Sequence, residues 1–144
     1  MDHFPVVPAF GFRARFDGRS AVLSGDTSFC ESLARASEGA DLLVCEAMNV
    51  GMMTDRIALL RAAGRVREAG LMSDVPSYHI GTHEIARMAE AAGVGEVMLS
   101  HIIPPLPSDD ASEAAFMQGM SDLYRRRIRV ARDMQRVPIV RRGA

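Results

Sequence analysis

The sequence has 144 residues, the size of one domain, and its 48% hydrophobic and 24% charged residues exclude a disordered chain. Its 17 basic and 18 acidic residues give a net charge of −1, which excludes a general attraction to nucleic acid or anionic lipid. No apolar run reaches the ~20 residues of a membrane span, and no signal-peptide pattern opens the chain. Two cysteines are too few for a disulfide framework. We therefore expect a cytoplasmic protein with no membrane partner.

The chain begins with a predicted pair of antiparallel strands. Residues 10–16 alternate aromatic and polar side chains, as a strand does when one of its faces is buried. Asp17-Gly18 is typical of a hairpin turn, and apolar residues resume at 20–24. These patterns predict a β-hairpin.

Helices and buried strands are then expected to alternate. Helical spacing of apolar residues predicts a helix over 28–37, and the apolar run 40–45 is typical of a buried strand. A longer helix is expected over 48–69, with Gly51 and Gly70 as its ends.

The second half of the sequence continues this alternation. Residues 74–81 are expected to form a loop, followed by a helix over 82–92 and a buried strand over 94–100. A helix is expected over 111–126 and a short strand or hairpin over 128–140. The element order predicts an α/β fold.

Three side chains suited to metal binding or proton transfer follow or end predicted strands. They are Asp26, Glu46 and His101. Ligands of α/β proteins bind outside the carboxyl ends of strands, and carboxylates with imidazoles form metal sites or general acid–base pairs. Structural roles compete with this hypothesis, because Asp26 is also a suitable N-cap for the next helix and His101 a suitable core histidine.

Five short segments stand in the order and spacing of one known family. They are His3 within residues 2–6, Ser24-Gly25-Asp26-Thr27, Cys45-Glu46-Ala47, His79, and Leu99-Ser100-His101. In this order they resemble the second half of a metallo-β-lactamase-fold hydrolase, in the branch that holds ribonuclease Z and the arylsulfatase-like enzymes. The resemblance implies that residues 1–144 are the C-terminal portion of that domain: half of an αββα sandwich, with a mixed sheet flanked by helices.

The resemblance also implies a zinc-dependent hydrolase with two ions in a complete site. The residues matching His3 and His101 each bind one ion, and the residue matching Asp26 bridges both. The residue matching His79, assisted by the one matching Glu46, protonates the leaving group or holds developing negative charge. The implied substrate is a small anionic ester, a phosphodiester or sulfate ester, attacked by a water that the two zinc ions activate.

Two features depart from the family pattern. The family's His-x-His-x-Asp-His motif, which supplies four ligands, is absent from this sequence, and Cys45 stands where the family often has histidine. Without the other half, one face of the sheet lacks its partner sheet, and soluble monomers rarely expose so large an apolar surface. We therefore expect a complementing chain, a homodimer, or a fragment of a longer protein.

Two other functions remain open. The first is an inactive fragment that binds a partner through its bare sheet face and its basic end, where eight arginines fall between Arg125 and Arg142. The second is tRNA 3′ processing, as in ribonuclease Z. The turn at Asp17-Gly18 is too short for the RNA-binding arm of short-form ribonuclease Z, so nucleic acid is not the expected substrate.

Overall fold

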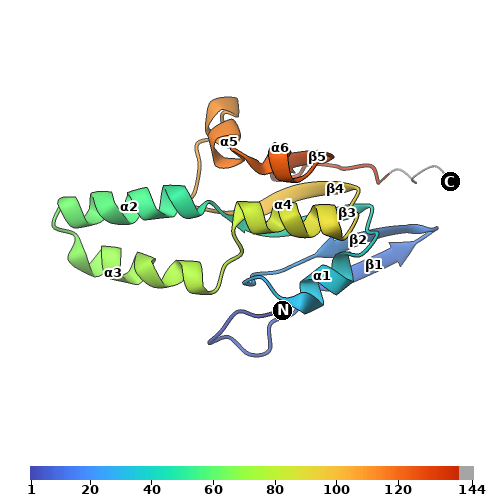
Figure 1. Ribbon diagram of the computed structural model, residues 1–144, viewed down its shortest axis with the longest axis horizontal. Coiled ribbons are helices and arrows are strands. Elements are labelled where there is room, and N and C mark those ends of the chain that lie inside the picture. Colours follow the sequence, from blue (N-terminus) through green and yellow to red (C-terminus); the bar gives the residue numbers. More distant parts are fainter. Residues whose placement is uncertain (140–144) are drawn as a thin grey trace.

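A five-stranded mixed sheet organises residues 1–139, the part of the chain that the computed structural model describes. Strands β1 (Phe12–Phe16) and β2 (Arg19–Leu23) form the predicted antiparallel hairpin. Strands β3 (Leu42–Met48), β4 (Glu96–Ile103) and β5 (Arg127–Val130) follow in parallel, so the strands lie in chain order (Figure 1). The predicted α/β class with a mixed sheet is confirmed.

The helices connect the parallel strands. They are α1 (Glu31–Ser37), α2 (Val50–Ala62), α3 (Val66–Asp74), α4 (Thr82–Ala91), α5 (Asp110–Phe116) and α6 (Met120–Leu123), with a 3-10 turn η1 (Val75–Ser77). Because each crossover moves to the next strand in the same direction and crossovers are right-handed, the helices that pack on the sheet share one face. Helices α2 and α3 form a hairpin that projects beyond the sheet (Figure 1). No helix within residues 1–139 is long and apolar enough to cross a membrane.

The hydrophobic core lies between the sheet and these helices. Val22, Leu43 and Leu99 point from neighbouring strands into it, and Leu33 and Ile85 meet them from α1 and α4. All five are fully buried. Burial of this kind is the main favourable term in folding, so this face holds the domain together.

The opposite face of the sheet is far more exposed. The Arg13 guanidinium donates hydrogen bonds to carbonyl oxygens at the end of α1, which places Arg13 on the helix side of β1. Side chains alternate along a strand, so Phe12 and Phe16 lie on the other side, where 68% and 85% of their surface is exposed. Leu23, the β2 partner of Phe12, is 45% exposed.

The segment after β5 covers part of this second face. Val137 and Ile139 line shallow hollows together with Leu42 on one side and with Ala14 and Phe16 on the other. The predicted strand or hairpin over 128–140 is therefore confirmed only as β5, because residues 131–139 contain no strand. The remaining residues, 140–144, which include two of the counted arginines, lie outside the described part.

The prediction of one helix over 48–69 is wrong. Helix α2 ends at Ala62, Gly64 adopts a φ of +72°, and α3 runs from Val66 to Asp74 with Gly70 inside it. A positive φ suits glycine and ends a helix, so Gly64, not Gly70, makes the break. The loop expected over 74–81 is accordingly shorter, since η1 follows α3 directly.

The prediction of one helix over 111–126 is also wrong. Helix α5 ends at Phe116 and α6 spans only Met120–Leu123, with Gly119 at a φ of +78° between them. The periodic apolar pattern is the same on both sides of the break, which explains why it reads as one helix. Several arginines at this end have structural partners: Arg129 pairs with Glu96, and Arg132 with Glu113.

Candidate active site

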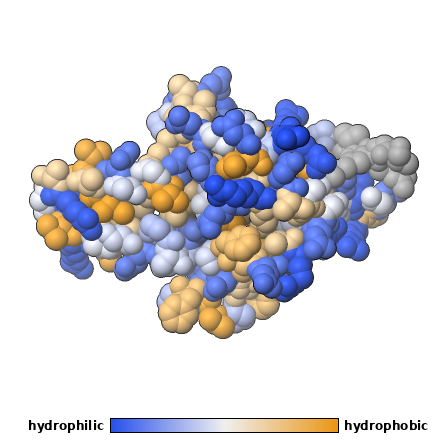
Figure 2. Space-filling view, in the orientation of Figure 1, coloured by the Kyte–Doolittle hydropathy of each residue, from blue (hydrophilic) through white to orange (hydrophobic). Residues whose placement is uncertain are grey.

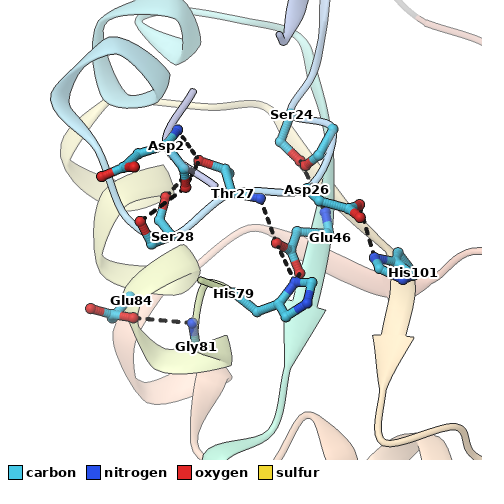
Figure 3. A network of polar contacts seen from close by, with 11 residues as sticks. Asp2, Ser24, Asp26, Thr27, Ser28, Glu46, His79, Gly81, Glu84 and His101 are labelled. Atoms are coloured by element: carbon cyan, nitrogen blue, oxygen red, sulfur yellow. Dashed lines mark hydrogen bonds and ion pairs between the residues drawn. The ribbon is translucent and has the colours of Figure 1, made fainter. Parts of the chain in front are cut away.

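The candidate site lies at the carboxyl edge of the sheet, where β2, β3 and β4 lie side by side (Figure 3). Glu46 lies within β3 and not after it as predicted, because β3 continues to Met48. His101, predicted to end its strand, lies two residues before the end of β4 at Ile103. The extension of both strands past the expected ends is held by a backbone hydrogen bond from Asn49 to Ile103.

His101 occupies a β-bulge in the middle of this edge. Glu46 pairs with Ser100 but Ala47 pairs with Ile102, so His101 is the extra residue, and its φ is +42°. A bulge bends its strand and redirects a side chain, which is how a residue inside a strand reaches a site at the edge.

Glu46 and His79 form a buried pair. The Nδ1 atom of His79 lies 2.9 and 2.8 Å from the two carboxylate oxygens of Glu46, and both side chains are at least 92% buried. The backbone N–H of Thr27 donates to Glu46 Oε1 at 2.6 Å, and the Glu46 N–H donates to the Ser24 hydroxyl. Every polar atom of the Glu46 carboxylate therefore has a partner, as a buried carboxylate requires.

Burial shifts the titration of both partners toward their neutral forms. It raises the pKa of Glu46 to about 7 and lowers the pKa of His79 to about 4. The main cause is the same in each case: removal from water disfavours the charged form. At neutral pH this favours an uncharged imidazole that Glu46 orients through Nδ1, an arrangement suited to proton transfer.

Asp26 and His101 form a second pair beside the first. Asp26 Oδ1 lies 2.9 Å from His101 Nδ1, and both side chains are half exposed. The backbone turn just before Asp26 requires glycine at position 25. The φ of Gly25 is +62°, and a Cβ there would lie 2.6 Å from the Phe10 carbonyl oxygen. Asp26 is not a helix N-cap, since Cys30 holds that position before α1, and a half-exposed His101 is not a core histidine.

His3 joins the site from the N-terminal segment. Its ring centroid lies 5.2 Å from that of His79, which lies 5.5 Å from that of His101. Hydrogen bonds between Asp2 and the segment Thr27–Ser28 tie this N-terminal stretch to the loop that carries Asp26 (Figure 3). The five predicted site residues thus converge on one place.

The donors present fit a metal ion. Glu46, His79 and His101 offer ligand atoms within 4.8 Å of one another. The set predicted from the sequence was His3, Asp26 and His101, so only His101 is common to the two. The buried Nε2 atom of His3 has no hydrogen-bond partner within residues 1–139, and an imidazole nitrogen left in this state suits a metal ligand. Imidazole nitrogens with carboxylate oxygens are a typical donor set for zinc.

Two residues of the site were not assigned a role from the sequence. Thr27 was noted only as part of a motif, although its N–H holds Glu46. Tyr78 packs against both His3 and His79, with centroids 5.1 and 4.9 Å away. Its position next to His79 in the sequence was the one available signal.

The chain is similar in sequence to part of several known proteins. No protein-family profile matches the sequence. Ribonuclease Z of Mycobacterium tuberculosis H37Rv is 33% identical over 138 residues, which cover 96% of this chain and 46% of the relative. Ribonuclease Z of Mycobacterium marinum is 34% identical over 146 residues, with 96% and 45% covered. The chain thus spans about half the length of these curated relatives.

The fold is also found in a solved structure. The metallo-β-lactamase-fold protein YhfI from Bacillus subtilis superposes with a TM-score of 0.57 and 21% identity, covering 84% of this chain and 40% of that one. The chain therefore has the fold of the metallo-β-lactamase-fold proteins, and its sequence is similar to the matching part of ribonuclease Z.

Proposed function

We propose that this chain forms half of the active site of a metal-dependent phosphodiesterase that cleaves RNA, as its relatives' name implies for them. The observation that carries the proposal is the meeting of two pairs, Glu46 with His79 and Asp26 with His101, at one edge of the sheet. One pair is buried and oriented for proton transfer, and the other is open to solvent and ligands. A purely structural role would not require a buried pair and an exposed pair of ionisable side chains side by side.

RNA is a better substrate proposal than the small anionic ester expected from the sequence. Two relatives are named ribonuclease Z, and neither similarity supports a sulfate ester. The alignment with the M. tuberculosis relative spans 138 residues and covers 96% of this chain, which leaves no room for a long insertion at Asp17-Gly18. The short turn is therefore no argument against an RNA substrate.

Each site residue has a proposed role. Zinc, when bound, supplies Lewis-acid activation of water and of a phosphoryl oxygen. His3, Asp26 and His101 are the proposed ligands, with Asp26 as the bridge in a complete site of two ions. Glu46 already accepts from Thr27 and contacts His79, so its proposed role is to orient His79. The protonated form of Glu46, which its raised pKa favours, would donate to Nδ1 and leave the proton of the neutral His79 on Nε2. His79 would then give the Nε2 proton to the leaving oxygen while the Glu46 proton moves to Nδ1, which leaves a neutral imidazole and a Glu46 carboxylate.

A complementing polypeptide region is part of the proposal. The exposed Phe12, Phe16 and Leu23 lie on one face of the β1–β2 hairpin, and the Phe12–Leu23 end of that hairpin leads into the loop that carries Asp26. More apolar side chains gather on the N-terminal loop, at the lower edge of Figure 2. Phe4 and Val7 of the N-terminal segment are exposed. The missing ligands would come from the region that covers this surface. We propose that both act in the cytoplasm, where the unpaired Cys30 and Cys45 remain reduced.

Native mass spectrometry in zinc-containing buffer tests the proposal. The chain is measured alone and mixed with the unmatched segment of M. tuberculosis ribonuclease Z. We expect a complex with about two zinc ions, and loss of zinc and turnover together in Asp26→Ala. A metal-free monomer or aggregate in both samples would overturn the hydrolase proposal and favour a partner-binding fragment.

His79→Ala separates proton transfer from metal binding. In the zinc-loaded complex we expect cleavage of a 3′-extended tRNA precursor to slow ~10²–10⁴-fold while zinc stays bound, the range for a lost general acid. Loss of zinc in this variant would instead make His79 a ligand. If the unaltered complex hydrolyses bis(p-nitrophenyl) phosphate but leaves the tRNA precursor uncut, the RNA proposal is wrong and a small anionic ester is the better substrate proposal.

A further inference from the structure

Among the three histidines of the site, His3 differs in that its ring makes no hydrogen bond to the described residues. Within residues 1–139, Glu46 holds His79 and Asp26 holds His101, but neither ring nitrogen of His3 has a hydrogen-bond partner. Metal-binding histidines are usually oriented by a hydrogen bond to their second nitrogen. A ring without such a hydrogen bond can be oriented by packing against neighbouring side chains.

Two aromatic rings contact His3. Tyr78 lies 5.1 Å away at an interplanar angle of 61°, and His79 lies 5.2 Å away at 73°. Tyr78 also contacts His79 at 4.9 Å, so the three rings form a closed triangle. Edge-on contacts at these separations are the favoured geometry of aromatic pairs.

Tyr78 is itself held by the backbone before it. It follows η1, its N–H donates to the Val75 carbonyl oxygen at 3.3 Å, and Pro76 restricts the turn. Its side-chain hydroxyl makes no hydrogen bond within residues 1–139. The ring is therefore the part of Tyr78 that acts on its neighbours.

We propose that Tyr78 is a positioning residue, whose ring packs His3 against His79 and so holds the His3 imidazole ready for a metal ion. The inference rests on the proposed function for its metal, but the packing itself is a property of the metal-free chain. It assigns the orienting role for His3 to an aromatic ring in place of the usual hydrogen-bond acceptor.

The test compares Tyr78→Phe, Tyr78→Ala and Tyr78→Leu in the full chain. Nuclear Overhauser contacts between histidine rings are measured in the metal-free protein. We expect the His3–His79 contact to persist in the Phe variant and to disappear in the Ala and Leu variants. The His79–His101 contact should persist in all three, because Glu46 and Asp26 hold those rings.

Zinc affinity is the second readout, measured by competition with a chromophoric chelator. We expect zinc affinity to fall ~10–100-fold in the Ala and Leu variants, the range for removing a neighbour that orients a metal ligand. The Phe variant should keep the affinity of the unaltered chain. A persistent His3–His79 contact in both the Ala and Leu variants would overturn the inference, and so would a Phe variant that behaves like Ala. If the unaltered chain and its complex bind no zinc, the proposed function fails, and the ring contacts alone decide the role of Tyr78.

Discussion

The two faces of the sheet differ in how completely they are covered. On the helix side, Val22, Leu43 and Leu99 are fully buried, whereas Phe12 and Phe16 on the other side are 68% and 85% exposed. The crossover helices that pack on the sheet lie on the first face, and α2 and α3 project beyond the sheet (Figure 1), so no helix of residues 1–130 is left to cover the second. The first face therefore holds the fold together, and the second is suited to association.

The site lies where these two faces meet. Residues of this chain alone bury Glu46 and His79, whereas Asp26 and His101 remain half exposed. The buried pair is complete without a partner, and the open pair is the part that a covering region would complete. The site therefore has a buried part and an exposed part, as the sheet has a covered face and an exposed face.

The largest difference is expected in stability. Leu43→Ala should lower the free energy of unfolding by ~2–5 kcal/mol, because it opens a cavity in the covered core. Phe16→Ala should change it by no more than ~0.5 kcal/mol, since its side chain already faces solvent. Urea unfolding of both variants measures the two effects, and similar losses would show that the second face also stabilises the isolated chain.

Association should depend on the second face. Phe12→Ser with Phe16→Ser should weaken binding of the unmatched segment of M. tuberculosis ribonuclease Z at least about 10-fold, because each buried phenylalanine is worth more than the ~1.4 kcal/mol of one decade. Leu59→Ser is the matched control, since Leu59 is 71% exposed on the projecting α2. Calorimetric titration measures both. Equal effects of the two changes would place the contact elsewhere.

The smallest effect in the unaltered chain is the dependence of its stability on pH, because two opposing shifts nearly cancel. Burial raises the pKa of Glu46 from 4.5 to about 7 and lowers that of His79 from 6.5 to about 4. Between pH 4.5 and 6.5 folding adds a proton at Glu46 and removes one at His79, so the two effects on stability oppose each other. In Glu46→Gln only the His79 effect remains, and stability should rise with pH from about 4 to 6.5 relative to the unaltered chain.

The complementary variant has the opposite sign. His79→Gln leaves the buried Glu46, whose ionisation opposes folding, so stability should fall as pH rises from 4.5 to 7. Urea unfolding across this range measures both variants. Parallel pH profiles for the two would show that the Glu46–His79 pair does not titrate in this way.

Local pattern was enough for much of the fold. The alternation at residues 10–16, the turn at Asp17-Gly18 and the apolar run 40–45 predicted three strands that the structure contains. The two long helices were predicted wrongly, because apolar spacing continues across Gly64 and Gly119. A periodic pattern does not reveal a single residue with positive φ, since glycine is also tolerated inside helices, as Gly70 is.

The site was predicted by residue type and order, and less well by geometry. Asp26, Glu46 and His101 were named because they follow or end predicted strands, and the structure brings them together with His3 and His79. The family resemblance implied that Glu46 assists His79, but the contact between Asp26 and His101 was not predictable. The position of His101 depends on a register shift between β3 and β4 that no local sequence signal marks.

The sequence by itself determined the α/β class, the hairpin, the buried strands and the identity of the residues that can bind a metal or move a proton. Each of these follows from side-chain chemistry or from spacing along a few residues. Only the tertiary structure decided that His101 sits on a bulge, that Glu46 holds His79, and that Tyr78 packs against His3. These are contacts between segments tens of residues apart, and they are set by strand register and by the space left between packed side chains.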